Sequence, residues 1–362
     1  MSTVRVSRKA LTQGFTIINV KILIVGPSWV GDMVMAQSLF MTLRQLYADC
    51  IIDVLAPDWS RPLLERMPEV RNAIAMPLGH GQLDLNKRRS LGRSLRQAKY
   101  DRAYVLPNSF KSAIVPFAAK IPKRIGWRGE MRYALLNDIR VLDKDKYSLM
   151  VQRFDALAYP ADAALPEKLP SPKLNIDNAL REETLSSFQL KLEKPVLGLC
   201  PGAEFGESKQ WPAQHYAAVA KEKIQSGWQV WIFGSQNDLP IADEILSSLS
   251  EEEQSSCRVL AGETSLAQAI DLLSVVDAVV SNDSGLMHVA AALSRPLVVL
   301  YGSTSPDFTP PLSENVEVLQ SDLDCSPCFK RECPYGHSDC LKKINSAEVL
   351  AELKKVCVTA SN

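Results

Sequence analysis

A carboxylate that follows a short apolar run is the first residue of this chain that could carry out chemistry. The segment Gly26–Asp32 (GPSWVGD) lies between a predicted strand and a predicted helix, and it ends in Asp32. It is neither a phosphate-binding Walker loop nor a dinucleotide-binding glycine motif. Aspartate at a helix start often caps the helix by accepting a bond from a free backbone N–H. The alternative is a carboxylate that faces a cleft and removes a proton from an incoming hydroxyl.

A lysine in a glycine-containing loop is the second candidate. Pro201–Trp211 (PGAEFGESKQW) follows another predicted strand. Gly202 and Gly206 let the backbone approach a ligand closely, and Lys209 brings a positive charge to the same loop. A diphosphate leaving group gains negative charge as its bond breaks, and such a lysine would stabilise it. The simpler alternative is a surface lysine.

The third motif is Ser281–Leu293 (SNDSGLMHVAAAL), where a predicted strand turns into a helix. Asp283, Ser284 and Gly285 form the turn. Free N–H groups at the helix start, together with the helix dipole, favour an anion such as a diphosphate. His288 lies one turn into this helix, where it could meet the same ligand or serve only in packing.

Apolar runs without alternation, separated by helical patterns, predict parallel sheets that are covered on both faces. The expected strands are Lys21–Gly26, Ile51–Leu55, Arg102–Leu106, Arg124–Gly126, Val196–Leu199, Gln229–Phe233, Arg258–Leu260, Ala278–Ser281 and Leu297–Tyr301. The expected helices include Met33–Tyr47, Ala213–Ser226, Leu239–Leu249, Leu266–Val275, Leu286–Leu293 and Ser346–Val356.

The length of 362 residues suits two domains. The Pro-rich stretch Tyr159–Leu174 indicates an interdomain linker. We expect an N-terminal extension (1–20), a first domain (21–160), a linker region (161–190), a second domain (191–345) and a C-terminal helix with its tail (346–362). Two doubly wound α/β domains in tandem place a ligand cleft between them, at the carboxyl ends of the strands.

The chain has no apolar run of the roughly 20 residues that a membrane span needs. Its N-terminus also lacks the features of a signal peptide. We therefore expect a cytoplasmic protein.

A net charge of zero conceals a strong asymmetry between the two halves. Residues 1–160 contain 25 Lys and Arg against 13 Asp and Glu, whereas residues 161–362 contain 16 against 28. The asymmetry could reflect attraction between two domains, or a basic domain that binds an anionic partner. No nucleic-acid-binding motif accompanies the basic residues, so we expect no nucleic acid partner. The densest basic residues are Lys87, Arg88, Arg89, Arg93, Arg96, Lys111, Lys120, Lys123, Arg124, Arg128 and Arg132.

Four of the eight cysteines cluster near the C-terminus, as Cys325, Cys328, Cys333 and Cys340, with His337 among them. These are ligand types for zinc or an iron–sulfur cluster, but the spacing after the first pair is irregular. Unmetallated thiols in a surface loop are the first interpretation, a structural metal is the second and redox bonds are the third. The remaining cysteines, Cys50, Cys200, Cys257 and Cys357, lie in apolar contexts and are interpreted as buried, inert thiols.

With the three motifs in this order, the chain resembles the bacterial heptosyltransferases of lipopolysaccharide core synthesis. The resemblance runs from about Lys21 to Pro311 and implies the GT-B fold, in which two Rossmann-like domains face a central cleft. Its N-terminal runs are similar to the family members that add the second heptose. The segments that carry the resemblance are Pro68–Gly81, Tyr100–Phe117, Gly126–Lys144, PGAEFG, LAGETSLAQAI, NDSGLMHVAAAL and SPDFTPPLS.

The resemblance implies roles for individual residues. Asp32 corresponds to the proposed general base, and Lys209 contacts the donor phosphates. The remaining expected donor-binding residues are Gly202, Asp238 (ribose), Thr264 (adenine), Asp283, Ser284, Gly285 and His288. The expected acceptor-binding residues are Gly31, Lys111, Arg128 and Arg132. The last three are basic and suit the carboxylates and phosphates of the acceptor.

The implied reaction is a single, inverting displacement that moves heptose from ADP-heptose to the 3-hydroxyl of the first heptose of heptosyl-Kdo₂-lipid A. We expect no metal and no cofactor, because Lys209 and the Ser284 and Gly285 amides could stabilise the leaving diphosphate. We also expect a monomer that contacts the cytoplasmic face of the inner membrane peripherally. The alternatives are transfer to Kdo₂-lipid A, a non-catalytic binding protein and an epimerase of similar architecture.

Overall fold

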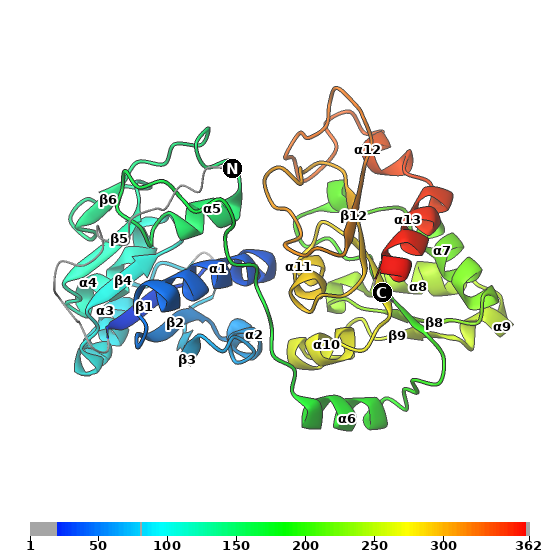
Figure 1. The fold of residues 1–362 in the computed structure, drawn as a ribbon, viewed down its shortest axis with the longest axis horizontal. Helices are drawn as coiled ribbons and strands as arrows, with labels where there is room; N and C mark the ends of the chain where they lie inside the picture. Colours follow the sequence, from blue (N-terminus) through cyan, green and yellow to red (C-terminus); the bar gives the residue numbers. More distant parts are fainter. Residues whose placement is uncertain (1–19, 80–81, 360–362) are drawn as a thin grey trace, which may run out of the picture.

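The computed structural model describes residues 20–79 and 82–359 and consists of two α/β halves, each built on a six-stranded parallel sheet (Figure 1). The strand order is β3-β2-β1-β4-β5-β6 in the first sheet and β12-β11-β10-β7-β8-β9 in the second. Apart from Val20, the expected N-terminal extension lies outside the described residues, as does the end of the tail at 360–362.

The first half follows a doubly wound pattern, in which buried apolar strands lie at the centre and helices cover both faces. The first strand, KILIV, is buried along almost its whole length, as expected for a parallel strand covered on both sides. The elements of this half are β1 (Lys21–Val25), α1 (Val30–Leu46), β2 (Ile51–Pro57), α2 (Arg61–Leu64), β3 (Val70–Met76), α3 (Leu85–Ser94), β4 (Arg102–Val105), α4 (Ile114–Ala118), β5 (Lys123–Trp127), β6 (Asp138–Arg140) and α5 (Met150–Asp155).

The second half repeats this plan. The C-terminal helix α13 packs against β11 and α7 of the same half. The elements are α6 (Asn178–Ser187), β7 (Val196–Cys200), α7 (Ala213–Gln225), β8 (Gln229–Ile232), α8 (Leu239–Ser247), α9 (Glu251–Gln254), β9 (Cys257–Val259), α10 (Leu266–Leu273), β10 (Ala278–Asn282), α11 (Gly285–Ala292), β11 (Leu297–Tyr301), β12 (Val316–Gln320), α12 (Asp339–Lys342) and α13 (Ser346–Thr359).

All nine expected strands are confirmed within one or two residues at their ends. The sequence interpretation did not identify β3, β6 and β12, which lie at or near the edges of the sheets. Helix α1 begins at Val30, three residues earlier than expected, and the expected linker 161–190 contains helix α6. The chain passes from the first sheet to the second between β6 and β7, and the domain boundaries given above stay predictions.

The two halves pack directly on each other. Helix α1 lies against α11, and α2 lies against α10 (Figure 1). A single apolar cluster continues from Met33 and Phe40 of α1 to Met287 of α11. Such a shared core stabilises one arrangement of the two halves, because opening it would expose apolar surface to water.

Polar contacts reinforce this arrangement at two further places. The Arg66 guanidinium contacts the Asp271 carboxylate at 2.5 Å, and Asp271 is fully buried. The Asp271 carboxylate also accepts a bond from the backbone N–H of Asp177, which precedes α6. On the other side of α1, the Met150 N–H donates to the Phe308 carbonyl at 2.8 Å.

Among the described residues, no helix combines the length and the hydropathy that crossing a bilayer requires.

Candidate active site

The starts of helices α1 and α11 meet where the two halves face each other. Each helix follows the carboxyl end of a central strand, β1 or β10. A Cβ atom added at Gly31 would lie 2.6 Å from Cδ2 of His288, and one added at Gly285 would lie 2.7 Å from Cβ of Val30. Both distances are shorter than real Cβ contacts, so both positions require glycine. This close approach brings the Gly26–Asp32 loop of the first half to the Ser281–Leu293 motif of the second.

Asp32 lies in the first turn of α1 and does not cap it. The capping position is Trp29, which provides no side-chain bond. Within the described part of the chain, no hydrogen bond or ion pair engages the Asp32 carboxylate. Burial raises the pKa of Asp32 to about 6, Lys209 lowers it, and the charge of Asp283 raises it. The capping interpretation is therefore wrong, and Asp32 is a carboxylate able to take up a proton near neutral pH.

Lys209 is held by a buried ion pair with Asp283. The lysine ends a short 3₁₀ helix, Glu207–Lys209, and its Nζ donates to Oδ2 of Asp283 at 2.7 Å. The side chains are 14% and 4% exposed. Thr304, after β11, donates its hydroxyl to the same oxygen at 2.6 Å. The Lys209 Nζ also lies 5.0 Å from the centre of the Phe205 ring. These contacts fix the ammonium group at the carboxyl ends of β7, β10 and β11.

Helix α11 directs its N-terminus toward this group. The Ser284 hydroxyl caps the helix by accepting from the Met287 N–H at 3.4 Å. The first amides of an α-helix have no partner within the helix, and the helix dipole adds positive potential there. The start of α11 and Lys209 together form a site suited to an anion.

His288 is buried on the face of α11 that touches α1. It is 4% exposed, and burial lowers its pKa to about 4. The imidazole is therefore neutral at physiological pH, and it packs against Gly31. It offers no positive charge to a diphosphate.

A buried asparagine fixes the loop that carries Lys209. Asn282, the last residue of β10, accepts from the Trp211 N–H at 3.1 Å and from the Tyr216 hydroxyl at 3.0 Å. Its amide donates to the Pro201 carbonyl at 2.7 Å. The Pro201–Trp211 loop is thus bonded at both ends to one side chain. Neither Asn282 nor Thr304 was predicted as a site residue. The signal for both was a polar residue at the carboxyl end of an apolar strand.

A comparison with protein families identifies the family of the chain. Residues 88–338, well over half of the chain, match glycosyltransferase family 9 (heptosyltransferase). The chain belongs to glycosyltransferase family 9.

Similar proteins support this assignment along the chain. Lipopolysaccharide heptosyltransferase 2 of Escherichia coli (strain K12) is 55% identical over 338 residues, covering 92% of this chain and 97% of that protein. Lipooligosaccharide heptosyltransferase 2 of Haemophilus influenzae is 52% identical over 307 residues, covering 83% and 88%. The solved structure of E. coli ADP-heptose LPS heptosyltransferase II superimposes with a TM-score of 0.85 at 52% identity, covering 95% of this chain and all of that one. The expected GT-B fold and glycosyltransferase class are confirmed.

Two of the residues expected to bind the donor of this family 9 glycosyltransferase lie together after β7 and β8. A Cβ added at Gly202 would lie 2.5 Å from the Asp238 carboxylate, so the glycine permits that contact. The Asp238 carboxylate accepts from the Ser235 N–H at 2.7 Å and from its hydroxyl at 2.8 Å. Asp238 lines a cavity of about 570 Å³ between the Ala203–Gln214 and Asn237–Glu244 segments. Asp32, Lys209 and Asp283 do not line this cavity.

Thr264 lies on the neighbouring turn after β9. Gly262, with φ +73°, turns the chain there, and its N–H bonds to the Gly234 carbonyl. The Thr264 hydroxyl donates to the Leu260 carbonyl at 3.2 Å. The predicted roles of Gly202, Asp238 and Thr264 in donor binding stay predictions.

The residues expected to bind the acceptor in this family 9 glycosyltransferase differ in exposure. Arg128 is exposed and Lys111 is partly exposed, so both side chains remain available to a partner. Arg132 is only 2% exposed, and its guanidinium donates to the carbonyls of Pro107 and Trp127. The geometry gives Arg132 a structural role, with no exposed donor for an acceptor.

Another member of the basic cluster is also internal. Arg88 is 5% exposed and donates to three backbone carbonyls. Part of the positive charge expected on the surface of the first half is therefore used inside it.

Proposed function

We propose that this protein transfers L-glycero-D-manno-heptose from ADP-heptose to the 3-hydroxyl of the first heptose of heptosyl-Kdo₂-lipid A, with inversion at the anomeric carbon. The names of its relatives, lipopolysaccharide and lipooligosaccharide heptosyltransferase 2, support heptose transfer to this class of acceptor, and that of E. coli ADP-heptose LPS heptosyltransferase II supports the donor. The observation that carries the proposal is the unpaired Asp32 carboxylate of one half, which lies in the field of the Lys209–Asp283 pair of the other.

In the proposed reaction, Asp32 accepts the proton of the acceptor 3-hydroxyl as its oxygen attacks the anomeric carbon. The bond between that carbon and the diphosphate oxygen breaks, and ADP departs with the electron pair. A single displacement of this kind inverts the anomeric configuration. The base can act at neutral pH because its pKa of about 6 keeps it ionised there while leaving it able to bind a proton.

The two carboxylates of the site have different roles in this proposal. Asp283 is committed to Lys209 and Thr304, so it acts as a positioning residue that fixes the ammonium group. Asp32 has no such partner and acts as the base. Two carboxylates that lie close together repel each other when both are ionised. The ion pair with Lys209 offsets the charge of Asp283, so that Asp32 can also ionise.

The leaving diphosphate is stabilised by Lys209 and by the amides at the start of α11. Preorganised charges and dipoles of this kind stabilise a developing negative charge without rearrangement. We propose that the chemical step needs no divalent cation, because these groups supply that charge. Transfer should then proceed at the same rate with and without added Mg²⁺.

We propose further that the first half contacts the cytoplasmic face of the inner membrane and that the protein is a monomer. Arg128 lies in a loop with the exposed apolar side chains Met131 and Tyr133, which are 82% and 64% exposed. Exposed basic and apolar side chains together suit the interface of an anionic membrane. Co-sedimentation with anionic vesicles should fall as salt is raised, and light scattering should give the mass of one chain.

The acceptor decides between the proposed function and its alternatives. ADP-heptose is offered with either heptosyl-Kdo₂-lipid A or Kdo₂-lipid A, and the products are separated by mass. We expect transfer to the first acceptor alone. Transfer to Kdo₂-lipid A would show that the protein adds the first heptose, and tight ADP-heptose binding without transfer to either would show a non-catalytic protein. The role of Asp32 as the base is tested in the same assay with Asp32→Asn. Asp58→Asn is the matched control, because the Asp58 side chain is exposed.

A further inference from the structure

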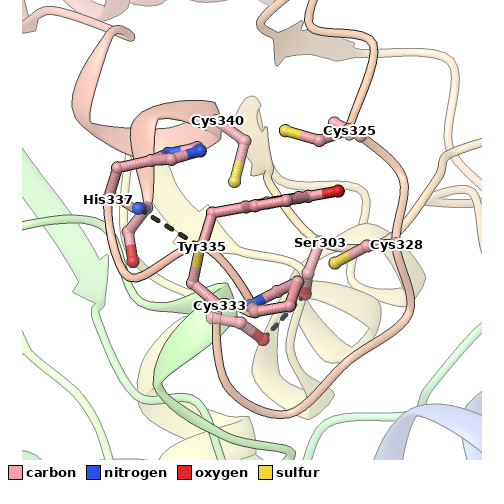
Figure 2. Close-up of a pocket in the computed structure, with 11 residues that line it drawn as sticks. Ser303, Cys325, Cys328, Cys333, Tyr335, His337 and Cys340 are labelled. Atoms are coloured by element: carbon pink, nitrogen blue, oxygen red, sulfur yellow. Dashed lines mark hydrogen bonds between the residues drawn. The ribbon is translucent and has the colours of Figure 1, made fainter.

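A cluster of four thiols lies beside the site and takes no part in the proposed reaction. Cys325, Cys328, Cys333 and Cys340 are free, partly buried cysteines. They belong to the segment 322–340, called here the cysteine loop, and they surround a cavity of about 20 Å³ (Figure 2). A cavity of this size holds one water or one ion.

Four thiols around one small cavity form a donor set for a soft metal ion. Tetrahedral coordination by four cysteine sulfurs is typical of zinc and of iron. As the side chains now stand, the described residues include no group of three or more His, Cys, Asp or Glu with the spacing of a metal site. Binding therefore requires the thiols to turn inward. The Tyr335 ring, drawn among the four sulfurs in Figure 2, is 69% exposed and stacks on the His337 ring, so metal binding also requires this ring to move outward.

The backbone already provides a hydrogen bond to one of the sulfurs. The Ser338 N–H donates to the Cys333 sulfur at 3.4 Å. Gly336 and Ser338, with φ of +73° and +54°, turn the chain so that residues 333–338 fold back on that sulfur. Bonds of this kind from outside the ligand set orient metal-binding side chains.

The cysteine loop also holds the segment that ends in Lys209. The backbone N–H of Ser208 donates to the Arg331 carbonyl at 3.2 Å, and its hydroxyl donates to the Lys330 carbonyl at 2.5 Å. A Cβ added at Gly206 would lie 2.4 Å from the same Arg331 carbonyl oxygen, so the two segments are in close contact. The position of Lys209 thus depends on the cysteine loop.

The same loop contacts the segment that carries Thr304. The Phe329 N–H donates to the Ser303 carbonyl at 2.7 Å, and the Ser326 hydroxyl donates to the Gly302 carbonyl at 2.7 Å. Both groups that hold Asp283, the ammonium of Lys209 and the hydroxyl of Thr304, are therefore next to residues fixed by the cysteine loop.

We propose that Cys325, Cys328, Cys333 and Cys340 bind one thiophilic divalent ion, zinc or ferrous iron, and that this centre holds the cysteine loop against the segments that carry Lys209 and Thr304. Binding replaces the four S–H protons, which pass to solvent, with four metal–sulfur bonds and involves no electron transfer. The resulting centre has a charge of −2, and the cysteine loop also contains the positively charged residues Lys330 and Arg331. The ion has a structural role, separate from the chemistry at Asp32.

The first test measures metal content and does not depend on the proposed function. The full chain is purified without chelators under reducing conditions, loaded with zinc or with ferrous iron, desalted and subjected to elemental analysis. We expect about one ion per chain, lowered at least tenfold in Cys333→Ser and in Cys340→Ser and unchanged in Cys257→Ser. Cys257 is a suitable control because it lies in β9, and burial raises its pKa to about 12. Less than a tenth of an ion per chain after loading with either metal would overturn the proposal.

A second measurement tests the site without substitutions, in case the cysteine variants fail to fold. The unaltered protein is titrated with Co²⁺, whose thiolate complexes absorb strongly in the near ultraviolet. We expect saturation at one equivalent, and a titration without that absorption would overturn the site.

The positioning role rests on the proposed function and has its own readout. Removal of the ion should raise KM for ADP-heptose at least fivefold, weaken ADP binding by a similar factor and leave KM for the acceptor unchanged. Unchanged ADP binding in metal-free protein would overturn this role while leaving the site itself standing.

Discussion

Replacement of Asp32 by Asn separates catalysis from stability at a single position. The substitution keeps the shape of the side chain and removes its negative charge. In the structure, that charge is unfavourable for folding, because burial raises the pKa of Asp32 from 3.8 to about 6. The proposed reaction nevertheless requires it. We therefore expect Asp32→Asn to be more stable and much less active than the unaltered protein.

The pKa sets the magnitude of the stability change. A carboxylate whose pKa is higher in the folded state than in the unfolded state destabilises the fold progressively as the pH rises from the unfolded to the folded value, and the penalty is complete above the folded value. Each pH unit is worth about 1.4 kcal/mol, so the ionised carboxylate costs at most about 3 kcal/mol above pH 7. The penalty disappears as the pH falls below about 4, where the carboxyl is protonated in both states. Loss of a general base lowers kcat/KM by about 10²- to 10⁴-fold.

Two assays follow both effects. Urea unfolding at pH 7.5 and at pH 4 should show stabilisation of Asp32→Asn at the higher pH only, while Asp58→Asn behaves like the unaltered protein at both. Transfer from ADP-heptose should fall by at least a hundredfold in Asp32→Asn alone. Full activity in Asp32→Asn would refute the role as base. Equal stability of the two proteins at pH 7.5 would refute the buried, unpaired state of the carboxylate.

Four further outcomes are expected. Lys209→Ala should lower kcat by at least a hundredfold and weaken ADP binding, measured by calorimetry, because the leaving diphosphate loses its cation; undiminished kcat would contradict this. Gly31→Ala should destabilise the fold by about 1–3 kcal/mol in urea unfolding, because its Cβ would lie 2.6 Å from Cδ2 of His288; unchanged stability and kcat would show that the halves do not meet there. The pH profile of kcat/KM should fall tenfold per unit below about pH 6 and stay level up to pH 8, since His288, with a pKa of about 4, is neutral throughout; an additional ionisation near pH 6.5 that disappears in His288→Gln would contradict the burial of the imidazole. Arg132→Ala should destabilise the protein by about 3 kcal/mol or more, because buried carbonyls lose their donor; a stable variant with a raised KM for the acceptor would instead support its predicted contact.

The sequence predicts the central strands well because each is buried on both faces and consists of apolar residues. It does not predict the strands near the sheet edges. Val70–Met76 and Val316–Gln320 are only partly buried and mix polar with apolar residues, so their composition resembles that of a loop. Their pairing depends on neighbours that are distant in the sequence.

The candidate site shows the same division between local and long-range information. Asp32, Lys209 and Asp283 were predicted because each follows an apolar strand in a distinctive turn. The partnership of Lys209 with Asp283 and Thr304 was not predicted, because it depends on β7, β10 and β11 lying side by side in the sheet. Arg132 was expected to bind the acceptor because it is basic, yet its guanidinium donates to the carbonyls of Pro107 and Trp127, and the sequence does not reveal these contacts.

The most direct test of the proposed reaction is the configuration of its product. ADP-heptose and heptosyl-Kdo₂-lipid A are incubated with the protein in EDTA, and the new linkage is determined by NMR. The proposed single displacement predicts one added heptose, attached at the 3-hydroxyl, with an anomeric configuration opposite to that of the donor. A product with the configuration of the donor would contradict it, because a single displacement at the anomeric carbon always inverts the configuration.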